Sequence, residues 1–381
     1  MHKSRTFDML LFICFLVLVG LGVAFVYSAS FPKAMIAGGT EANPFSFAAK
    51  QIIFAAIGIV AMLTMMFMRL AAWRKLFWPL IVITAGLLLL AAFLSKIHGN
   101  AAWISIGAFR FQPSEFAKVS VILTMATFLA KRPWLVKSVK GLFSGPAWFV
   151  LGPVGLVVLQ KDLGTALCLA AGTIPVLAMA GAKFRYWGPA VLIMLLIGGL
   201  FVMHSDRKVR IDAWFRPFDL SIEQGHQPRH GLIAVGSGGW LGLGFCCSRQ
   251  KYGYLPGSEN DYIFAIIAEE LGFVWTVLLL FVPFAFIMYR GFTIAHCAPD
   301  EYSALVATGC TTMLVTQAIL NMAVVLNLIP SMGVNLPFIS TGGSSLIASM
   351  MMAGLLLNVS ALTPERAAHD DTELTAQPAG T

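Results

Sequence analysis

Long apolar runs separated by short polar connections recur along nearly the whole chain. A helix needs about 20 apolar residues to cross the hydrocarbon core of a bilayer. By this measure, the pattern predicts spans at residues 8–29, 46–68, 76–95, 114–131, 186–204, 262–290, 302–328 and 338–360. Residues 146–182 are equally apolar but are interrupted by Gln160, Lys161 and Asp162, so we expect two short spans that meet at this polar corner. The sequence therefore predicts an all-α polytopic membrane protein with about ten transmembrane helices.

The composition supports this fold class. Hydrophobic residues make up 58% of the 381 residues and charged residues 12%, whereas a soluble domain has about 25% charged residues. A large soluble enzyme is therefore excluded. The net charge is +8, but Lys and Arg are distributed between the apolar runs instead of forming one stripe. Such a distribution favours contact with anionic lipid headgroups over nucleic acid as a partner.

The basic residues also predict an orientation. One set of alternating short loops carries twelve Lys and Arg residues and the other set carries four. Because basic loops stay in the cytoplasm, both chain termini are expected there. The apolar run at residues 9–27 is longer than that of a signal peptide, so we expect it to remain as the first span. We expect one membrane domain over residues 1–362 and a disordered cytoplasmic tail over residues 363–381.

Residues 205–261 form the longest predicted connection, on the outer side. It combines aromatic residues such as Trp214 and Trp240 with many basic residues. Loops longer than about 12–15 residues are usually functional or disordered. Function is therefore expected on the outer face.

Two glycine-rich motifs allow more than one interpretation. The stretch GSGGWLGLGF (Gly236–Phe245) lacks the Gly-Lys-Ser/Thr ending of a phosphate loop. Its glycines most simply allow the backbone to turn and approach closely, although Gly238 and Gly239 are candidates for a direct backbone contact to a substrate phosphate. In LPFISTGGSSL, close helix packing around Ser344 is the favoured interpretation.

Charged residues at membrane depth are costly and usually pair or serve function. Arg110, Glu115 and Lys118 lie at the outer mouth of the expected span 114–131. Glu115 and Lys118 are three residues apart on a helix, so a local ion pair and a substrate site are both consistent with the spacing. Asp162 either caps the helix that follows it or contributes to such a site.

The stretch GYLPGSENDYIFAIIAEELGFVW concentrates scarce carboxylates at the start of an apolar run. Asp261 is a candidate N-cap of the helix expected from about Tyr262, and also a candidate general base. Glu269 lies eight residues further along, which is about 12 Å on a helix. Because paired carboxylates in glycosidic chemistry lie about 5–9.5 Å apart and face one site, these two cannot form such a pair. We expect Glu269 and Glu270 to brace the bundle, and a base at Asp261 to act alone or with partners from other spans.

The order of FQPSEFAK, QKDLGTA, IAVGSGGWLGLGF, SRQKYGYLP, DYIFAIIAEELG and NLIPSMGVNLPFISTGGSS resembles the SEDS family (shape, elongation, division and sporulation). The SRQKYGYLP block is more similar to its division and sporulation branch. The resemblance implies a ten-span peptidoglycan glycosyltransferase that polymerises lipid II at the outer face of the bacterial cytoplasmic membrane. It also implies partnership with a class B penicillin-binding protein, a transpeptidase, and with other membrane proteins of the divisome or elongasome.

The resemblance places the family's essential acidic residue at Asp261, while Gly257 and Asn260 depart from the usual pattern around it. Residues expected to contact substrate are Arg110, Glu115, Lys118, Asp162, Gly238, Gly239, Arg249, Lys251 and Ser344. Basic side chains among these, or a divalent cation such as Mg²⁺ or Mn²⁺, would neutralise the leaving group. No protein-bound metal site is expected, because the six cysteines are scattered. The alternative functions are a lipid II flippase, and a non-catalytic scaffold for the transpeptidase.

Overall fold

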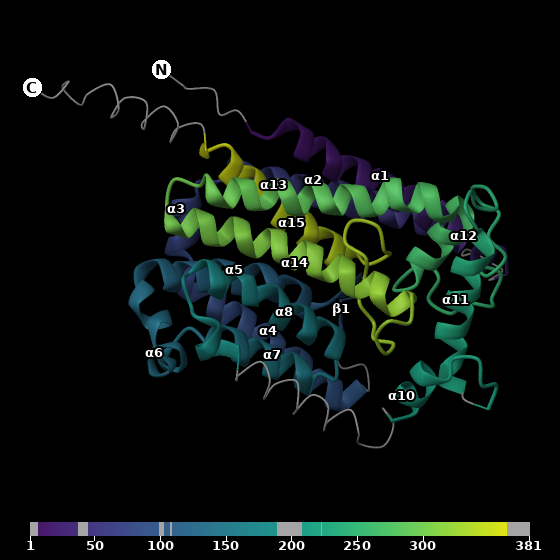
Figure 1. The fold of residues 1–381 in the computed structure, drawn as a ribbon, viewed down its shortest axis with the longest axis horizontal. Coiled ribbons are helices and arrows are strands. Elements are labelled where there is room, and N and C mark those ends of the chain that lie inside the picture. Colours follow the sequence, from purple (N-terminus) through teal and green to yellow (C-terminus); the bar gives the residue numbers. More distant parts are fainter. Residues whose placement is uncertain are drawn as a thin grey trace, which may run out of the picture.

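The computed structural model describes residues 7–36, 45–98, 103–106, 109–188, 208–221 and 223–363. Within these ranges the chain forms an elongated bundle of helices (Figure 1). The first half contains α1 (Met9–Ile36), α2 (Phe45–Phe67), α3 (Leu70–Lys75), α4 (Phe77–His98), α5 (Pro113–Lys131), α6 (Val139–Ser144), α7 (Trp148–Leu159) and α8 (Leu163–Met179). The second half contains α10 (Lys208–Phe215), α11 (His226–Gly238), α12 (Ile263–Thr276), α13 (Val282–His296), α14 (Glu301–Val325) and α15 (Gly343–Ser360).

These helices confirm the expected polytopic all-α class. Six helices within the described ranges are long and apolar enough to cross a membrane, and α7 and α8 are shorter apolar helices. The last two meet at the polar corner of residues 160–162, as the sequence predicts. The expected span 186–204 lies almost entirely outside the described residues, as do the first six residues and the tail from residue 364.

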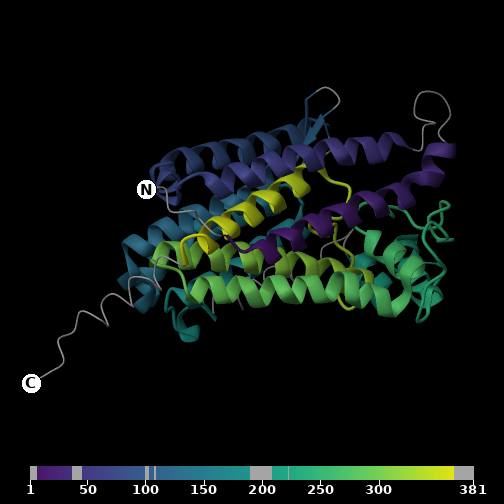
Figure 2. The same ribbon diagram turned by 90° about the horizontal axis from the view of Figure 1, so that it is seen from above.

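Helices α14 and α15 form the core of the bundle. In their most apolar stretches 78% and 83% of the residues are buried inside the protein, against 11% in α4. Helix α15 packs along α2, where a side chain at Gly354 would come within 2.2 Å of the Met62 carbonyl oxygen. The missing side chain lets the two backbones touch, which is how small residues promote helix association in membranes. Figure 2 shows α15 in yellow lying beside α1 in purple.

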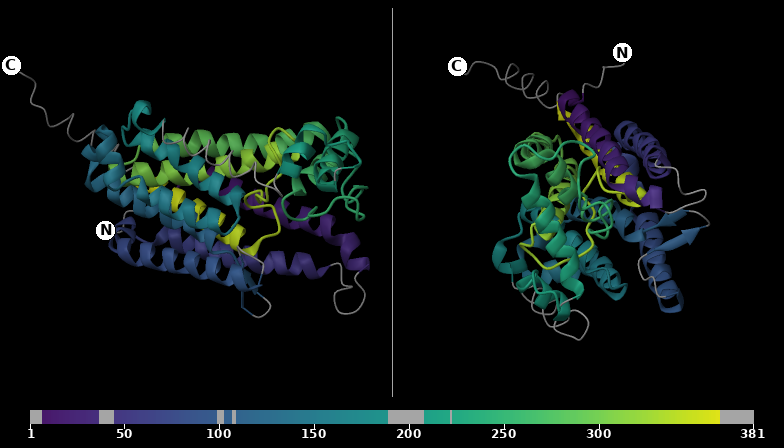
Figure 3. Two further views of the ribbon diagram at one scale, coloured as in Figure 1. Left: turned by 90° about the horizontal axis from the view of Figure 1, so that it is seen from below. Right: turned by 90° about the vertical axis from the view of Figure 1, so that its right-hand side faces the viewer.

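The two ends of the bundle differ in character. Helices α3 and α6 lie toward one end, and α10 and α11 lie toward the other (Figure 1). The right panel of Figure 3 looks onto the end that carries α10 and α11. Between α4 and α5, β1 (Ile104–Ile106) and β2 (Phe109–Phe111) form an antiparallel hairpin in which Ser105 pairs with Arg110. This small sheet, which the sequence pattern did not predict, holds Arg110 ahead of α5.

The connection expected at residues 205–261 is partly helical. It contains α10, a 3₁₀ turn at Glu223–Gly225, and α11, which packs against α12. The glycine-rich segment that follows α11 docks on the backbone of α12 where that helix kinks at Gly272. Phe273 N–H donates to the Gly239 carbonyl, and Leu243 N–H donates to the Glu269 carbonyl. The glycine-rich segment thus supplies hydrogen-bond partners for backbone groups of α12 that the kink leaves without partners inside the helix.

Glycine is required at this docking point because two backbones meet. Gly242 has φ +82°, and a Cβ there would lie 2.2 Å from the Glu270 carbonyl oxygen. A Cβ at Gly238 would lie 2.1 Å from the Ala268 carbonyl oxygen. The structure thus places these glycines in close backbone packing, in line with the simpler interpretation of GSGGWLGLGF.

Candidate active site

A cavity of about 1090 Å³ lies where α2, β2, the α7–α8 corner, α10 and the irregular segment between α14 and α15 meet. These elements are far apart in sequence, and the helix packing brings them to one end of the bundle. The charged and amide side chains in its lining are Lys50, Gln51, Arg110, Gln112, Lys161, Asp162, Arg210, Asn260, Asp261 and Asn335. Of the residues that the sequence singled out, Asp261, Asp162 and Arg110 are therefore brought together in one cavity.

Asp261 precedes α12 but does not cap it. The N-cap position is Tyr262, and in this described segment no side-chain hydrogen bond caps the helix. The capping interpretation of Asp261 is therefore wrong, because the helix begins one residue too late for it. With its carboxylate not committed to the helix amides, Asp261 can line the cavity instead.

The surroundings of Asp261 raise its pKa to about 6. Burial is the main cause, because it disfavours the charged carboxylate, and the nearby negative charge of Glu259 acts in the same direction. The hydrogen bond from its own backbone amide and the positive charge of Arg210 lower the pKa and partly offset this effect. A carboxylate with a pKa near 6 is mostly ionised at pH 7 and is a stronger base than an ordinary Asp.

The backbone around Asp261 is held firmly in place. Asn321 on α14 donates from Nδ2 to the Asp261 carbonyl at 2.7 Å and to the Val334 carbonyl at 2.6 Å. Gly257 has φ +72°, and a Cβ there would lie 2.6 Å from Asp261 Oδ1. The absence of a side chain at residue 257 therefore leaves room for the Asp261 carboxylate.

Asp162 lines the same cavity from the α7–α8 corner, far from Asp261 in the sequence. Its Oδ1 accepts from the Thr165 N–H at 3.1 Å, so the expected capping role is present. Its Oδ2 accepts from Gln112 Nε2 at 2.9 Å. Because both oxygens already have donors, Asp162 is better suited to holding the cavity wall than to removing a proton.

Four basic side chains line the same cavity, namely Lys50, Arg110, Lys161 and Arg210. Sequence reasoning singled out only Arg110 as a candidate contact. Lys50 carried a usable signal, because it is the only charged residue in the expected span 46–68. Arg210 carried none, because it is one of many basic residues in the long connection. Together the four bring positive charge to the cavity, which suits it to an anionic ligand.

Glu115 and Lys118 form a buried ion pair behind the cavity. Lys118 Nζ lies 2.8 Å from Glu115 Oε2 and 2.7 Å from Gln317 Oε1 on α14. Gln317 in turn donates to the carbonyl of Asn335, which lines the cavity. The pair therefore connects α5 and α14 to the cavity wall through one hydrogen-bonded chain.

Ser344, another candidate contact, is buried at the start of α15. Its hydroxyl accepts a hydrogen bond from the Gln112 N–H at 3.1 Å. It therefore joins α15 to the residue that precedes α5, which agrees with the packing interpretation of its motif.

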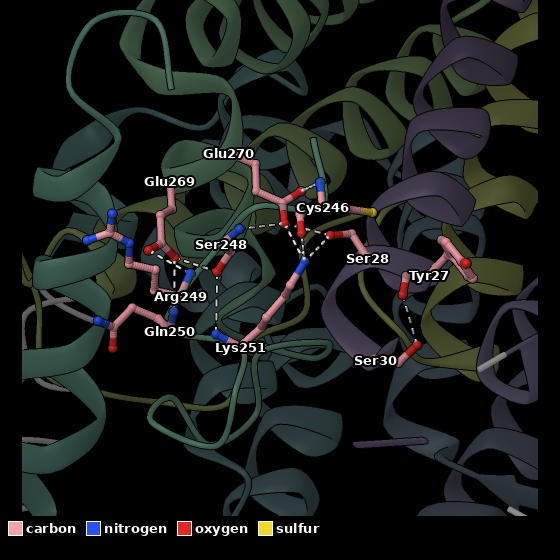
Figure 4. Close-up of polar contacts among 10 residues, drawn as sticks. All are labelled: Tyr27, Ser28, Ser30, Cys246, Ser248, Arg249, Gln250, Lys251, Glu269 and Glu270. Carbon is pink, nitrogen blue, oxygen red and sulfur yellow. Dashed lines mark hydrogen bonds and ion pairs between the residues drawn. The ribbon is translucent and has the colours of Figure 1, made fainter. Parts of the chain in front are cut away.

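Arg249 and Lys251 belong to a separate cluster between α1 and α12, drawn in Figure 4. Lys251 Nζ forms a fully buried ion pair with Glu270 at 2.9 Å and donates to Ser28 Oγ at 3.0 Å. Glu269 accepts from the Arg249 N–H at 3.0 Å and from the hydroxyl of Ser248. The carboxylates of α12 thus clamp the segment before Asp261, which matches the bracing role expected for Glu269 and Glu270.

The described residues contain no group of three His, Cys, Asp or Glu side chains placed to hold a metal ion. In this part of the chain the groups available to neutralise an anionic ligand are the four basic side chains.

Known proteins resemble this chain both in sequence and in fold. The family model of FtsW, RodA and SpoVE, described as cell cycle proteins, matches residues 8–365. The chain is 37% identical to stage V sporulation protein E of Bacillus subtilis over 94% of its own length and 98% of that protein. It is 35% identical to the probable peptidoglycan glycosyltransferase FtsW of Geobacter sp. (strain M18), with the same two coverages.

Two solved structures share the fold. One belongs to a peptidoglycan synthase complex described as coordinating polymerisation and crosslinking; its TM-score is 0.75 at 27% identity, covering 95% of this chain and 98% of that one. The other is the rod shape determining protein RodA of Thermus thermophilus, with a TM-score of 0.67 at 27% identity, covering 93% and 97%.

Proposed function

The chain belongs to the FtsW, RodA and SpoVE family of cell cycle proteins, and from this premise we propose that Asp261 is the general base of a peptidoglycan glycosyltransferase. The activity itself follows from the family, because close relatives are named for it over nearly their full length. The substrate we propose is lipid II, a disaccharide-peptide carried on a polyprenyl pyrophosphate.

The proposed reaction is a single displacement. The Asp261 carboxylate takes the proton from the 4-hydroxyl of the acceptor sugar, and that oxygen attacks the anomeric carbon of the donor with inversion. The bond from this carbon to the pyrophosphate oxygen breaks, and the polyprenyl pyrophosphate leaves with the electron pair. Lys50, Arg110 and Arg210 offset the charge that develops on the leaving group.

One observation supports this proposal most directly: a carboxylate with a raised pKa and four basic side chains line the same cavity. A base alone would support many hydrolytic reactions, and basic side chains alone would support anion binding. Their combination suits transfer from a donor with a pyrophosphate leaving group.

The test is Asp261→Asn, assayed for polymerisation of lipid II in a purified complex with the partner transpeptidase. We expect polymerisation to be lost, because the amide cannot accept the proton, while the complex still assembles. Asp219→Asn is a matched control, since Asp219 is partly exposed, does not line the cavity, and accepts hydrogen bonds from its sequence neighbour Ser221. Full polymerisation by Asp261→Asn would contradict the assignment of Asp261 as the general base.

The partner and the orientation are proposals of the same kind. The similar chain in a peptidoglycan synthase complex supports a class B penicillin-binding protein as partner. The excess of basic residues in alternating loops supports cytoplasmic termini, with the cavity facing outward across the bacterial cytoplasmic membrane. Protease protection of a tag added to the C-terminus in sealed vesicles tests this orientation.

A lipid II flippase and a scaffold remain the competing functions. Alternating access calls for a site near the middle of the membrane, whereas the cavity here is lined by the first residues of α2, α8 and α15 and by Asp261 just before α12. Vesicle assays separate the three: an enzyme makes glycan strands, a flippase only moves lipid II, and a scaffold does neither.

A further inference from the structure

A second cavity of about 490 Å³ lies between α4, α5 and α7 and is lined mainly by apolar side chains. Its lining, within the described residues, shares nothing with that of the candidate active site. The exposed rings of Trp78 and Trp148 flank it, together with Phe128 and Phe149. Small residues, including Gly152, make room for an occupant, since a Cβ at Gly152 would meet no atom within 4 Å.

The groove has the length of one membrane leaflet. Along α4 its lining runs from Trp78 to Leu88, a rise of about 15 Å at 1.5 Å per residue. The hydrocarbon core of a bilayer is about 30 Å thick, so the groove extends over about half of it. The tryptophans lie at one end of this length, as expected for aromatic side chains at the membrane interface.

Positive charge gathers at that same end. Arg132 lines the groove, and its guanidinium lies 5.4 Å from the centre of the Phe128 ring. Lys131, Lys137 and Lys140 are exposed nearby in sequence. Between residues 116 and 161 the chain has no Asp or Glu. The carboxylate that α5 does carry, Glu115, lies at the opposite end of that helix and is paired with Lys118, so it does not compete for these basic groups.

We propose that this groove binds one anionic phospholipid of the surrounding membrane, in the leaflet away from the candidate active site. An acyl chain lies against Leu88, Phe149 and Gly152, and the phosphate lies at Arg132. The charge at the mouth selects this occupant, because each basic residue near a membrane surface favours anionic over neutral lipid. A zwitterionic lipid would fill the apolar part equally well but would leave the positive charge uncompensated.

The experiment is native mass spectrometry of the full-length protein, purified in mild detergent with equimolar phosphatidylglycerol and phosphatidylethanolamine. We expect the wild-type protein to retain one phosphatidylglycerol in preference to phosphatidylethanolamine. Gly152→Leu fills the groove and should lower this retention at least fivefold. Gly155→Leu is the matched control, because Gly155 lies on the same helix, also has open space around it, and does not line the groove.

A second variant tests the headgroup separately from the groove. Arg132→Gln should lower the preference for phosphatidylglycerol about fivefold, which corresponds to about 1 kcal/mol for one basic residue. The proposal is wrong if Gly152→Leu retains as much lipid as the wild type, if Gly155→Leu loses as much as Gly152→Leu, or if the wild type retains both lipids equally. Arg132→Gln changes an exposed side chain, so it keeps the test decisive if Gly152→Leu does not fold.

Discussion

Removal of the Lys251 ammonium should destabilise the protein through the charge it leaves behind. Glu270 is fully buried and accepts from four donors: Lys251 Nζ at 2.9 Å, Ser28 Oγ at 2.6 Å, and the N–H groups of Cys246 and Ser248 at 3.0 and 3.2 Å. In Lys251→Met only the three neutral donors remain. Breaking a buried pair by removing one partner costs about 3–5 kcal/mol. Because three hydrogen bonds survive, we expect the lower end, about 3 kcal/mol.

The assay is thermal unfolding of the detergent-purified protein, followed by the loss of its folded peak in size-exclusion chromatography. For a chain of 381 residues, a loss of about 3 kcal/mol corresponds to a decrease of roughly 3–5 °C in Tm. The exposed Lys137 offers a matched control, because Lys137→Met removes an ammonium group that is already in solvent. This variant should keep Tm within about 1–2 °C of the wild-type value.

The double variant Lys251→Met, Glu270→Gln separates lost charge pairing from lost packing. It removes the unpaired charge while keeping the shape of both side chains, so Tm should recover at least half of the loss. An unchanged Tm in the single variant, or a double variant no more stable than the single one, would refute the reasoning.

Three further predictions concern the cavity and the fold. Burial raises the pKa of Asp261 to about 6, so protonation should disable the base as the pH falls. We therefore expect kcat/KM for polymerisation at pH 5 to be about tenfold below its plateau above pH 7. A flat profile between pH 5 and 8 would count against this role. Lys50→Gln should lower kcat/KM about tenfold through loss of one charge-assisted contact, and an unchanged rate would remove Lys50 from the site. Gly242→Ala should lower Tm by several degrees because its Cβ meets the backbone of α12 at 2.2 Å, whereas Gly236→Ala, which meets nothing within 4 Å, should not; equal effects would contradict the docking geometry.

The amino-acid sequence by itself determined the membrane-spanning pattern. Because apolar runs of about 20 residues are typical of membrane spans, each expected segment within the described ranges contains a helix. The span expected at 338–360 is the one that begins late, because residues 338–342 are irregular and α15 starts at Gly343. The polar interruption at residues 160–162 was enough to separate α7 from α8, because a helix carrying Lys161 and Asp162 through lipid would be costly. The place of Asp261 in the chain was also readable, since its motif resembles that of a known family.

Only the tertiary structure decided which charged residues share a cavity. Lys50 and Arg210 join Asp261 because α2 and α10 reach the same end of the bundle, and no spacing along the chain encodes that meeting. Lys251 lies close to Asp261 in sequence, yet its ammonium is buried in an ion pair with Glu270. Hydrophobic patterning specifies which segments enter the membrane, but the partner of each polar side chain depends on how the helices pack, because charges interact over distances in space and not along the chain.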